Sequence, residues 1–300
     1  MTIERTQAVN FHGEDVQPSP PDLALFHVIP VPYEKSVSYG TGTAAGPQAI
    51  LDASCQLELF DGKSVPADFG IHTLPMLDCS GSHEDALARI EAAVAACLSL
   101  EKIPIVLGGE HTITYGAIRA LQQKHLDFGV VQFDAHADLR ETYGGSLFSH
   151  ACVMKRVFDL GIPLLQLGTR SYSLEEHTLR QEQEIAHIDA EDIFRMDVHE
   201  FVLPANFPEK VFITFDVDGL DPSIMPATGT PVPGGLNWYQ AMWLLEGIVD
   251  SRICIGFDVV ELAPVPVLPS SSFTAAQLVY TIMGFLSRSQ INRKYWGLCT

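Results

Sequence analysis

The stretch VFITFDVDGLDP, residues 211–222, carries the clearest structural signal in this 300-residue chain. An uninterrupted apolar run that ends in acidic residues is typical of a parallel strand covered on both faces. Similar short apolar runs recur along the chain, at 26–33, 103–109, 128–134, 163–169 and 252–258. We therefore predict a central, mostly parallel sheet built from these runs.

Helical segments with recognisable starts lie between the apolar runs. Pro47 follows Gly46 and suits a first helical turn, and Ser82, Ser149 and Asn237 each precede a helical pattern. Alternating strands and helices predict a three-layer α/β/α fold whose ligands bind beyond the carboxyl ends of the strands. We expect residues 1–25 to form an N-terminal arm and residues 26–300 a single domain.

The composition favours a globular protein that attracts cations. Hydrophobic residues make up 47% of the chain, and 18 Lys and Arg stand against 37 Asp and Glu, for a net charge of −19. Such a charge repels nucleic acid and attracts a metal or a cationic substrate. No secretory signal or CxxC motif is found. Prolines break the first half of the uncharged stretch 262–287, which leaves residues 273–286 as an expected core helix. We therefore predict a cytoplasmic protein with no membrane or nucleic-acid partner.

Acidic and imidazole side chains follow several of the predicted strands. Because side chains alternate along a strand, residues 134, 136 and 138 should share one face, as should residues 216 and 218. Two adjacent strand ends would then place four carboxylates and a histidine in one pocket, with a second histidine joining from a third strand. The residues concerned are His111, Asp134, His136, Asp138, Asp216 and Asp218, and Asp258 and Glu261 follow the last apolar run.

Four carboxylates in one pocket require cations. Like charges at short range and burial both oppose ionisation, and two divalent ions would neutralise the four negative charges. Oxygen ligands with two imidazoles and no thiolate favour two Mn²⁺ per subunit, although Zn²⁺, Co²⁺ or Fe²⁺ could bind the same groups. Any one of these aspartates could instead cap a helix or stabilise a loop. Repetition of the pattern at three strand ends argues for the metal site.

These motifs resemble those of the ureohydrolase family, which includes the arginases and agmatinases. GGEH at 108–111, FDAHAD at 133–138 and TFDVDGLDPSIMPATGTPVPGG at 214–235 are similar to its three metal-binding blocks, and GFDVVELAP at 256–264 to its substrate-binding block. The resemblance implies an arginase-like fold over residues 26–300, a binuclear Mn²⁺ site and assembly into homotrimers or homohexamers. Its implied ligands are the six residues His111, Asp134, His136, Asp138, Asp216 and Asp218.

The resemblance also implies a reaction and two catalytic residues. A guanidinium carbon is a poor electrophile, so water must be activated between two cations and the leaving nitrogen must be protonated. His150, in SHACVMKR, resembles the proton shuttle of the family, and we expect a helix N-terminus and nearby metal ions to keep it neutral. Glu261 resembles the residue that binds the guanidinium.

Agmatine, which would give putrescine and urea, is the predicted substrate. SHACVMKR and GFDVVELAP look more like the agmatinase branch, and a dication suits an acidic protein. Arg140, in the loop 139–149, could instead bind the carboxylate of arginine, guanidinobutyrate or formiminoglutamate, or pair with Glu141 or another loop acid. A non-catalytic metal-binding regulatory subunit is a further alternative, which retention of His150 and Glu261 argues against.

Overall fold

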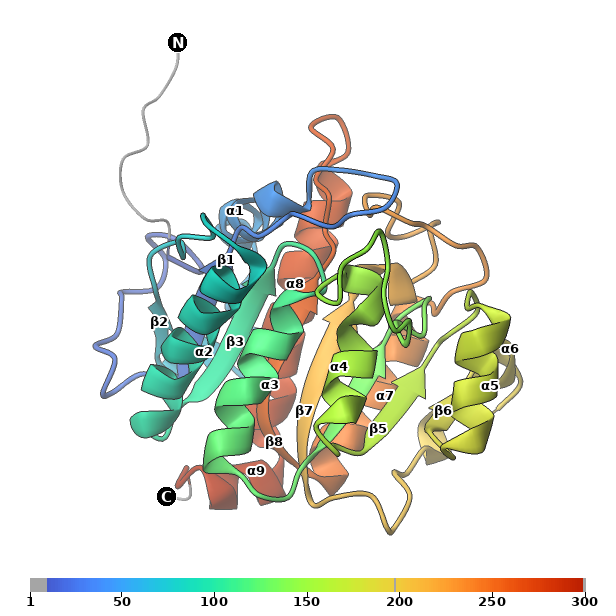
Figure 1. Ribbon diagram of the computed structural model, residues 1–300. Coiled ribbons are helices and arrows are strands. Elements are labelled where there is room, and N and C mark those ends of the chain that lie inside the picture. Colours follow the sequence, from blue (N-terminus) through green and yellow to red (C-terminus); the bar gives the residue numbers. More distant parts are fainter. Residues whose placement is uncertain (1–9, 197, 299–300) are drawn as a thin grey trace.

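A single parallel sheet forms the centre of the molecule. The computed structural model describes residues 10–196 and 198–298. Within these ranges the chain forms an eight-stranded sheet in the order β2-β1-β3-β8-β7-β4-β5-β6 (Figure 1). The strands are β1 Phe26–Val31, β2 Ile71–Thr73, β3 Ile103–Gly108, β4 Gly129–Phe133, β5 Leu164–Leu167, β6 Ala186–Ile188, β7 Lys210–Asp216 and β8 Ile253–Val260.

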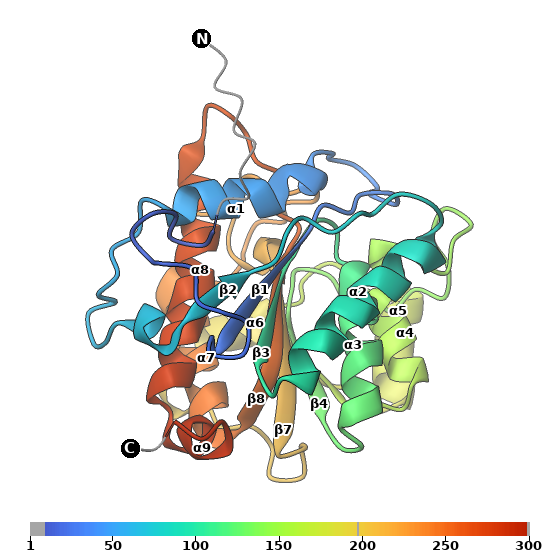
Figure 2. The ribbon, with the colours of Figure 1, turned by 90° about the vertical axis from the view of Figure 1, so that its left-hand side faces the viewer.

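Helices cover both faces of the sheet, which confirms the predicted three-layer fold. Helices α2 to α5 lie on one face, and α1, α7, α8 and α9 lie on the other (Figure 2). Each face has its own core of buried apolar side chains. The helices are α1 Gly46–Ser54, α2 His83–Ser99, α3 Ile113–Lys124, α4 Val153–Asp159, α5 Leu174–Glu182, α6 Ala190–Arg195, α7 Trp238–Ser251, α8 Pro269–Arg288 and α9 Gln290–Tyr295.

The strand order places four chemically important chain segments side by side. Strands β3, β8, β7 and β4 are neighbours, and the segments that follow them carry the predicted site residues. The register pairs Phe133 with Phe215, so that Asp134 and Asp216 leave adjacent strands at the same level. Parallel pairing thus brings residues distant in sequence to one edge of the sheet.

All six apolar runs form strands, but the prediction missed β2 and β6. Both have only three residues and lie at the two edges of the sheet, where one side is unpaired and a continuous apolar run is not required. Helices α3, α5, α6 and α9 were also not predicted.

Two predicted helix starts need correction. Ser149 is followed by a 3₁₀ turn, His150–Cys152, and α4 begins only at Val153. Helix α8 begins at Pro269, four residues before the expected Phe273, because a proline in the first turn loses no helical hydrogen bond.

The described part of the N-terminal arm packs on the domain. The backbone N–H of Phe11 donates to Thr73 Oγ1 at 3.1 Å, and that of His12 donates to Ser54 Oγ at 2.9 Å. Both side chains are buried. The boundary between arm and domain stays a prediction.

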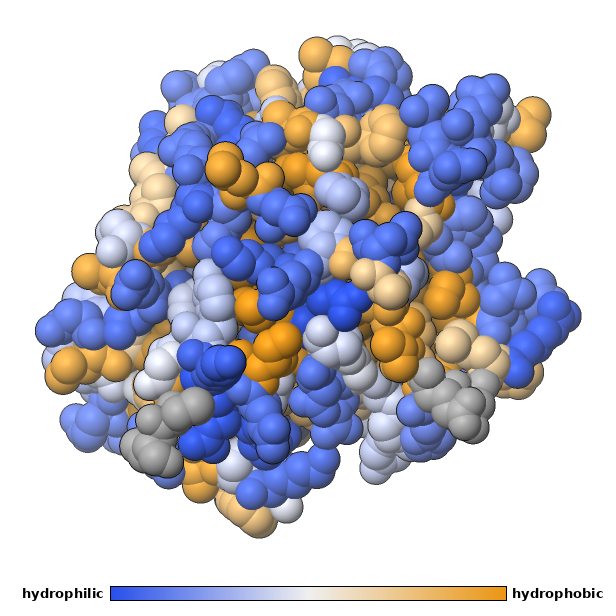
Figure 3. Space-filling model, turned by 90° about the horizontal axis from the view of Figure 1, so that it is seen from below, coloured by the Kyte–Doolittle hydropathy of each residue, from blue (hydrophilic) through white to orange (hydrophobic). Residues whose placement is uncertain are grey.

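Among the described residues, no helix combines the length and apolar character needed to cross a bilayer. Hydrophilic and hydrophobic residues are intermixed on the face seen from below (Figure 3).

Candidate metal centre and active site

The six predicted ligands meet at the carboxyl edge of the central strands. His111 follows β3, and Asp216 is the last residue of β7. Asp218 lies in the 3₁₀ turn Val217–Gly219. The prediction that strand alternation aligns these residues was wrong, because β4 ends at Phe133 and the next three ligands lie in the loop after it: Asp134, His136 and Asp138.

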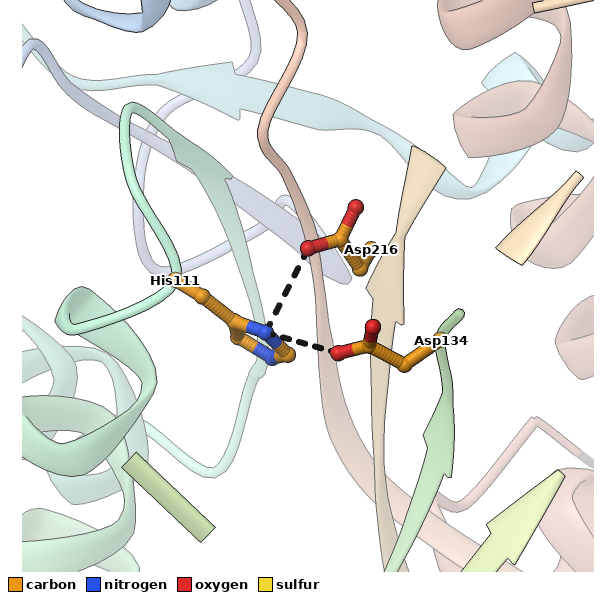
Figure 4. A group of neighbouring side chains, drawn as sticks. All are labelled: His111, Asp134 and Asp216. Atoms are coloured by element: carbon orange, nitrogen blue, oxygen red, sulfur yellow. Dashed lines mark ion pairs between the residues drawn. The ribbon is translucent and has the colours of Figure 1, made fainter. Parts of the chain in front are cut away.

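His111 is the centre of the first group of candidate ligands. Its Nδ1 lies 3.1 Å from Asp134 Oδ2, 3.1 Å from Asp138 Oδ2 and 3.5 Å from Asp216 Oδ2. Figure 4 shows Asp134 and Asp216 converging on this one nitrogen. The ligand atoms of His111, Asp134 and Asp216 all lie within 4.8 Å of one another, as a metal site requires.

A second group is built around His136 and shares one carboxylate with the first. His136 Nδ1 lies 3.1 Å from Asp218 Oδ2 and 3.6 Å from Asp134 Oδ1. Asp134 therefore faces one histidine with each of its two oxygens. This arrangement describes two adjacent candidate metal positions that have Asp134 in common.

The pKa values in the cluster reflect an excess of buried negative charge. Burial and the neighbouring Asp134 carboxylate raise the pKa of Asp138 to about 7. Burial and Asp218 raise the pKa of Asp216 well above its ordinary value. Burial alone would lower the pKa of His136, but Asp134 and Asp218 outweigh it and raise that pKa to about 12. The ionised carboxylates are thus stable only beside positive charge. Protonated histidines provide this charge here, and bound metal ions could take the place of those protons.

Short polar contacts hold the aspartates in place. The backbone N–H of His136 donates to Asp134 Oδ1 at 2.6 Å, and that of Asp218 donates to Asp216 Oδ1 at 2.8 Å. Gln132 Nε2 donates to the other oxygen of Asp134 at 2.7 Å. Sequence reasoning missed Gln132, because a glutamine inside an apolar strand carries no motif.

Glu261 and His150 meet beside the cluster. The Glu261 Oε1 atom accepts a hydrogen bond of 2.7 Å from the His111 backbone N–H and lies 3.7 Å from His150 Nδ1. Glu261 has a φ of +65°, a conformation that costs energy for a residue other than glycine and that the surrounding structure must impose. The structure thus brings the predicted pair, His150 and Glu261, together at the end of β8.

One of the two causes expected to keep His150 neutral, a helix N-terminus, is not found at that residue. His150 lies in a 3₁₀ turn before α4, so it does not occupy the N-terminus of an α-helix. Burial lowers the pKa of His150, with the positive charge of His111 and His136 adding to the shift and Glu110 opposing it.

Glu110 holds the loop that contains Ser36, which contacts His150. The sequence did not reveal this role. The buried carboxylate of Glu110 accepts hydrogen bonds from the backbone N–H groups of Lys35 and Ser36 at 2.6 and 2.7 Å, and from the Ser36 hydroxyl at 2.6 Å. The Ser36 hydroxyl oxygen in turn accepts from the His150 backbone N–H at 3.1 Å. The position of Glu110 in the GGEH motif was the only sequence feature that could have indicated this role.

A cavity of about 240 Å³ opens beside these residues. Its lining includes His136, His150, Arg140 and Tyr143. Arg140 Nε lies 3.8 Å from Glu176 Oε2, and its guanidinium lies over the Tyr143 ring at 5.4 Å. Arg140 thus pairs with Glu176, which is distant in sequence, and not with its sequence neighbour Glu141.

Comparison with known proteins places the chain in a family. The model of the Arginase family matches residues 24–284. An N(1)-aminopropylagmatine ureohydrolase of Synechocystis is 40% identical, over 88% of this chain and 89% of that protein, and an agmatinase of Pyrococcus horikoshii is 34% identical, over 88% and 93%. The crystal structure of agmatine ureohydrolase of Thermoplasma volcanium matches with a TM-score of 0.85 at 30% identity, over 99% of this chain and 98% of that one.

The fold and the cluster define an α/β protein with two adjacent candidate metal positions. The chain belongs to the arginase family, and within it to the ureohydrolase enzymes that resemble agmatinases. The family resemblance drawn from the sequence motifs is confirmed.

Proposed function

We propose that this enzyme is a binuclear manganese hydrolase that cleaves a guanidino group to urea and a primary amine, with agmatine giving putrescine and urea. One observation carries the proposal: the six candidate ligands converge at the sheet edge within reach of a histidine–glutamate pair. They are His111, Asp134, His136, Asp138, Asp216 and Asp218, with His150 and Glu261 beside them.

The residues fit a pair of divalent ions. The buried Nδ1 of His111 has no hydrogen-bond partner among the described residues, although three carboxylates face it. We assign His111, Asp134, Asp138 and Asp216 to one ion and Asp134, His136 and Asp218 to the other. Oxygen donors with one imidazole at each position suit Mn²⁺. Two bound ions would supply the positive charge that activates water as a nucleophile near neutral pH.

Glu261 would bind the guanidinium of the substrate. Burial raises the pKa of Glu261 well above its ordinary value, so that a cationic partner would offset the cost of its ionisation. The His111 backbone N–H fixes one carboxylate oxygen, which orients the group. A planar guanidinium can donate two parallel hydrogen bonds to such a carboxylate.

His150 would move the proton that cleavage requires. Its lowered pKa keeps the imidazole neutral near pH 7, so it can accept a proton and pass it to the leaving nitrogen. The Nε2 atom of His150 is buried and has no hydrogen-bond partner among the described residues, which leaves it available for this transfer.

The pocket favours a substrate tail without a carboxylate. Arg140 is the cation that could bind a carboxylate, and Glu176 and Tyr143 already engage it. Agmatine, which ends in an amine, satisfies this condition. N(1)-aminopropylagmatine is a second candidate, because the relative with 40% identity bears the name of a ureohydrolase for that compound.

A substrate panel tests the proposed function. Purified protein loaded with Mn²⁺ is assayed for urea and amine release from agmatine, N(1)-aminopropylagmatine, arginine and guanidinobutyrate, and for formamide release from formiminoglutamate. We expect the highest kcat/KM with one of the first two compounds. Preference for a carboxylate-bearing substrate would contradict the assignment, and no turnover of any compound would favour a regulatory subunit. The cytoplasmic location and the homotrimeric or homohexameric state stay predictions.

A further inference from the structure

A row of buried polar groups runs from the far side of the His111 ring. His111 Nε2 lies 2.8 Å from Thr214 Oγ1, which lies 3.3 Å from Thr114 Oγ1. The Thr114 hydroxyl donates to Asp258 Oδ2 at 2.8 Å. We refer to Thr214, Thr114 and Asp258 as the hydroxyl row.

The hydroxyl row is part of the rigid centre of the fold. Thr214 and Asp258 are register partners on β7 and β8, and Thr114 lies in the first turn of α3. His111 and all three residues of the row are 0% exposed. With no solvent access, these groups must satisfy their hydrogen bonds largely with one another.

Asp258 stands apart from the other acidic residues that follow the predicted strands. The sequence analysis placed Asp258 after an apolar run, but the residue lies inside β8. Its carboxylate accepts a hydrogen bond from Thr114 and does not face the candidate metal ligands. Burial raises the pKa of Asp258 to about 6, and the hydrogen bond from Thr114 opposes that rise. At pH 8, above this pKa, the group is therefore an ionised carboxylate.

An ionised carboxylate at the end of the row sets the direction of every hydrogen bond in it. A carboxylate can only accept, so the Thr114 hydroxyl must donate to Asp258. The Thr114 oxygen is then free to accept from the Thr214 hydroxyl, and the Thr214 oxygen can accept from His111. In this order, the proton of the neutral imidazole lies on Nε2, and the lone pair on Nδ1 points toward the three aspartates.

We propose that Asp258 is a positioning residue that acts through Thr114 and Thr214 to hold His111 in the tautomer whose Nδ1 binds metal. The proposal rests on the proposed metal centre, but it concerns how tightly that centre binds its ion and not which substrate it hydrolyses. Second partners of metal-bound histidines fix the ring orientation and the tautomer, and their loss costs ~10- to 100-fold in metal affinity.

The test removes one hydroxyl without changing the shape of the side chain. Thr114→Val breaks the row, Thr114→Ser restores the hydroxyl, and Thr281→Val is the matched control, because the Thr281 hydroxyl donates only within α8, to Gln277 O at 2.7 Å. The metal-free proteins are titrated with Mn²⁺ by calorimetry at pH 8, and thermal unfolding is recorded for each. This readout measures metal binding and does not depend on turnover.

We expect Thr114→Val to bind one of its two ions ~10- to 100-fold more weakly, with the His136 position unchanged. Thr114→Ser and Thr281→Val should bind like the wild type. If Thr114→Val does not fold, Asp258→Asn serves instead. This substitution keeps the shape of the side chain but adds an amide donor, which can reverse the direction of the hydrogen bonds in the row. Unchanged affinity in the folded variant, or no rescue by serine, would overturn the proposal. A wild type that binds two Mn²⁺ but hydrolyses nothing would overturn the proposed function alone.

Discussion

Asp134 links the two candidate metal positions, since each of its oxygens faces a different histidine. Its Oδ2 lies 3.1 Å from His111 Nδ1 and its Oδ1 lies 3.6 Å from His136 Nδ1. A single side chain therefore belongs to both candidate positions.

Replacing His150 should separate metal binding from catalysis. We expect His150→Ala to bind two Mn²⁺ but to lose ~10²- to 10⁴-fold in kcat, because proton transfer to the leaving nitrogen is removed. Turnover and calorimetric metal titration are measured together. His187→Ala, on the edge strand β6, is the control and should keep full activity. An unchanged kcat in His150→Ala would remove the proton-transfer role.

The buried His12 should make stability depend on pH. Burial lowers the pKa of His12 from 6.5 to about 4, with Asp15 opposing the shift. The unfolded chain therefore binds a proton near pH 6.5, while the folded protein does so only near pH 4. The resulting stabilisation is complete above pH 6.5 and is lost as the pH falls from 6.5 to 4, by ~3 kcal/mol for this one group.

His12→Phe tests this dependence. The neighbouring rings of Phe11 and Tyr280 can accommodate another aromatic side chain, and neither ring nitrogen of His12 has a hydrogen-bond partner among the described residues. The free energy of unfolding is measured by urea denaturation from pH 8 to pH 4. The variant should lose less stability than the wild type over this range, and an identical loss in both proteins would contradict the assignment.

Helix α7 shows how a short local signal positions an element. The Asn237 side chain accepts from the Gln240 backbone N–H at 2.9 Å, and the Gln240 side chain accepts from the Asn237 backbone N–H at 3.0 Å. This capping box satisfies two backbone donors at the start of the helix. Because the pattern is local, the sequence predicted this helix start correctly, whereas Ser149, with no side-chain cap hydrogen bond, was misread.

Removal of the cap should weaken α7 without affecting the site. Asn237 is exposed, so Asn237→Ala removes little besides the capping hydrogen bond. We expect a loss of ~1 kcal/mol in the free energy of unfolding, measured by urea denaturation. Asn237→Ser keeps a capping oxygen and should retain most of the stability. Equal stability of the alanine variant and the wild type would show that packing alone holds the helix start.

The whole molecule concentrates negative charge at one edge of its sheet, and stability should therefore depend on bound metal. In metal-free protein, the raised pKa of Asp138, about 7, means that the folded state holds a proton that the unfolded state has already released. The contribution of Asp138 to the stability of the metal-free protein should then fall as the pH rises from about 4 to 7. A bound cation would stabilise the carboxylate and remove this loss.

Metal removal tests this charge argument on the intact protein. We expect chelator-treated protein to have a lower Tm than Mn²⁺-loaded protein, with a difference that widens from pH 5 to pH 8. Scanning calorimetry of both forms provides the measurement, and added Mn²⁺ should restore the Tm. A constant difference across this range would mean that the cluster does not couple metal binding to ionisation.

The sequence by itself determined what local patterns encode. Continuous apolar runs gave the six longer strands, capping residues gave several helix starts, and the acidic and imidazole motifs identified the residues that cluster and the family. These features depend on neighbours in the chain, and they can be read without knowing where distant segments lie. The short edge strands β2 and β6 carry too few residues for such a pattern.

Only the tertiary structure decided how the residues meet. Strand order β3-β8-β7-β4 brings His111, Asp134 and Asp216 together, and no sequence spacing specifies that order. The pairing of Arg140 with Glu176, the loop held by Glu110 and the hydroxyl row ending at Asp258 likewise join segments far apart in the chain. Their geometry follows from burial and packing of the whole sheet, which are properties of the folded molecule and not of any one segment.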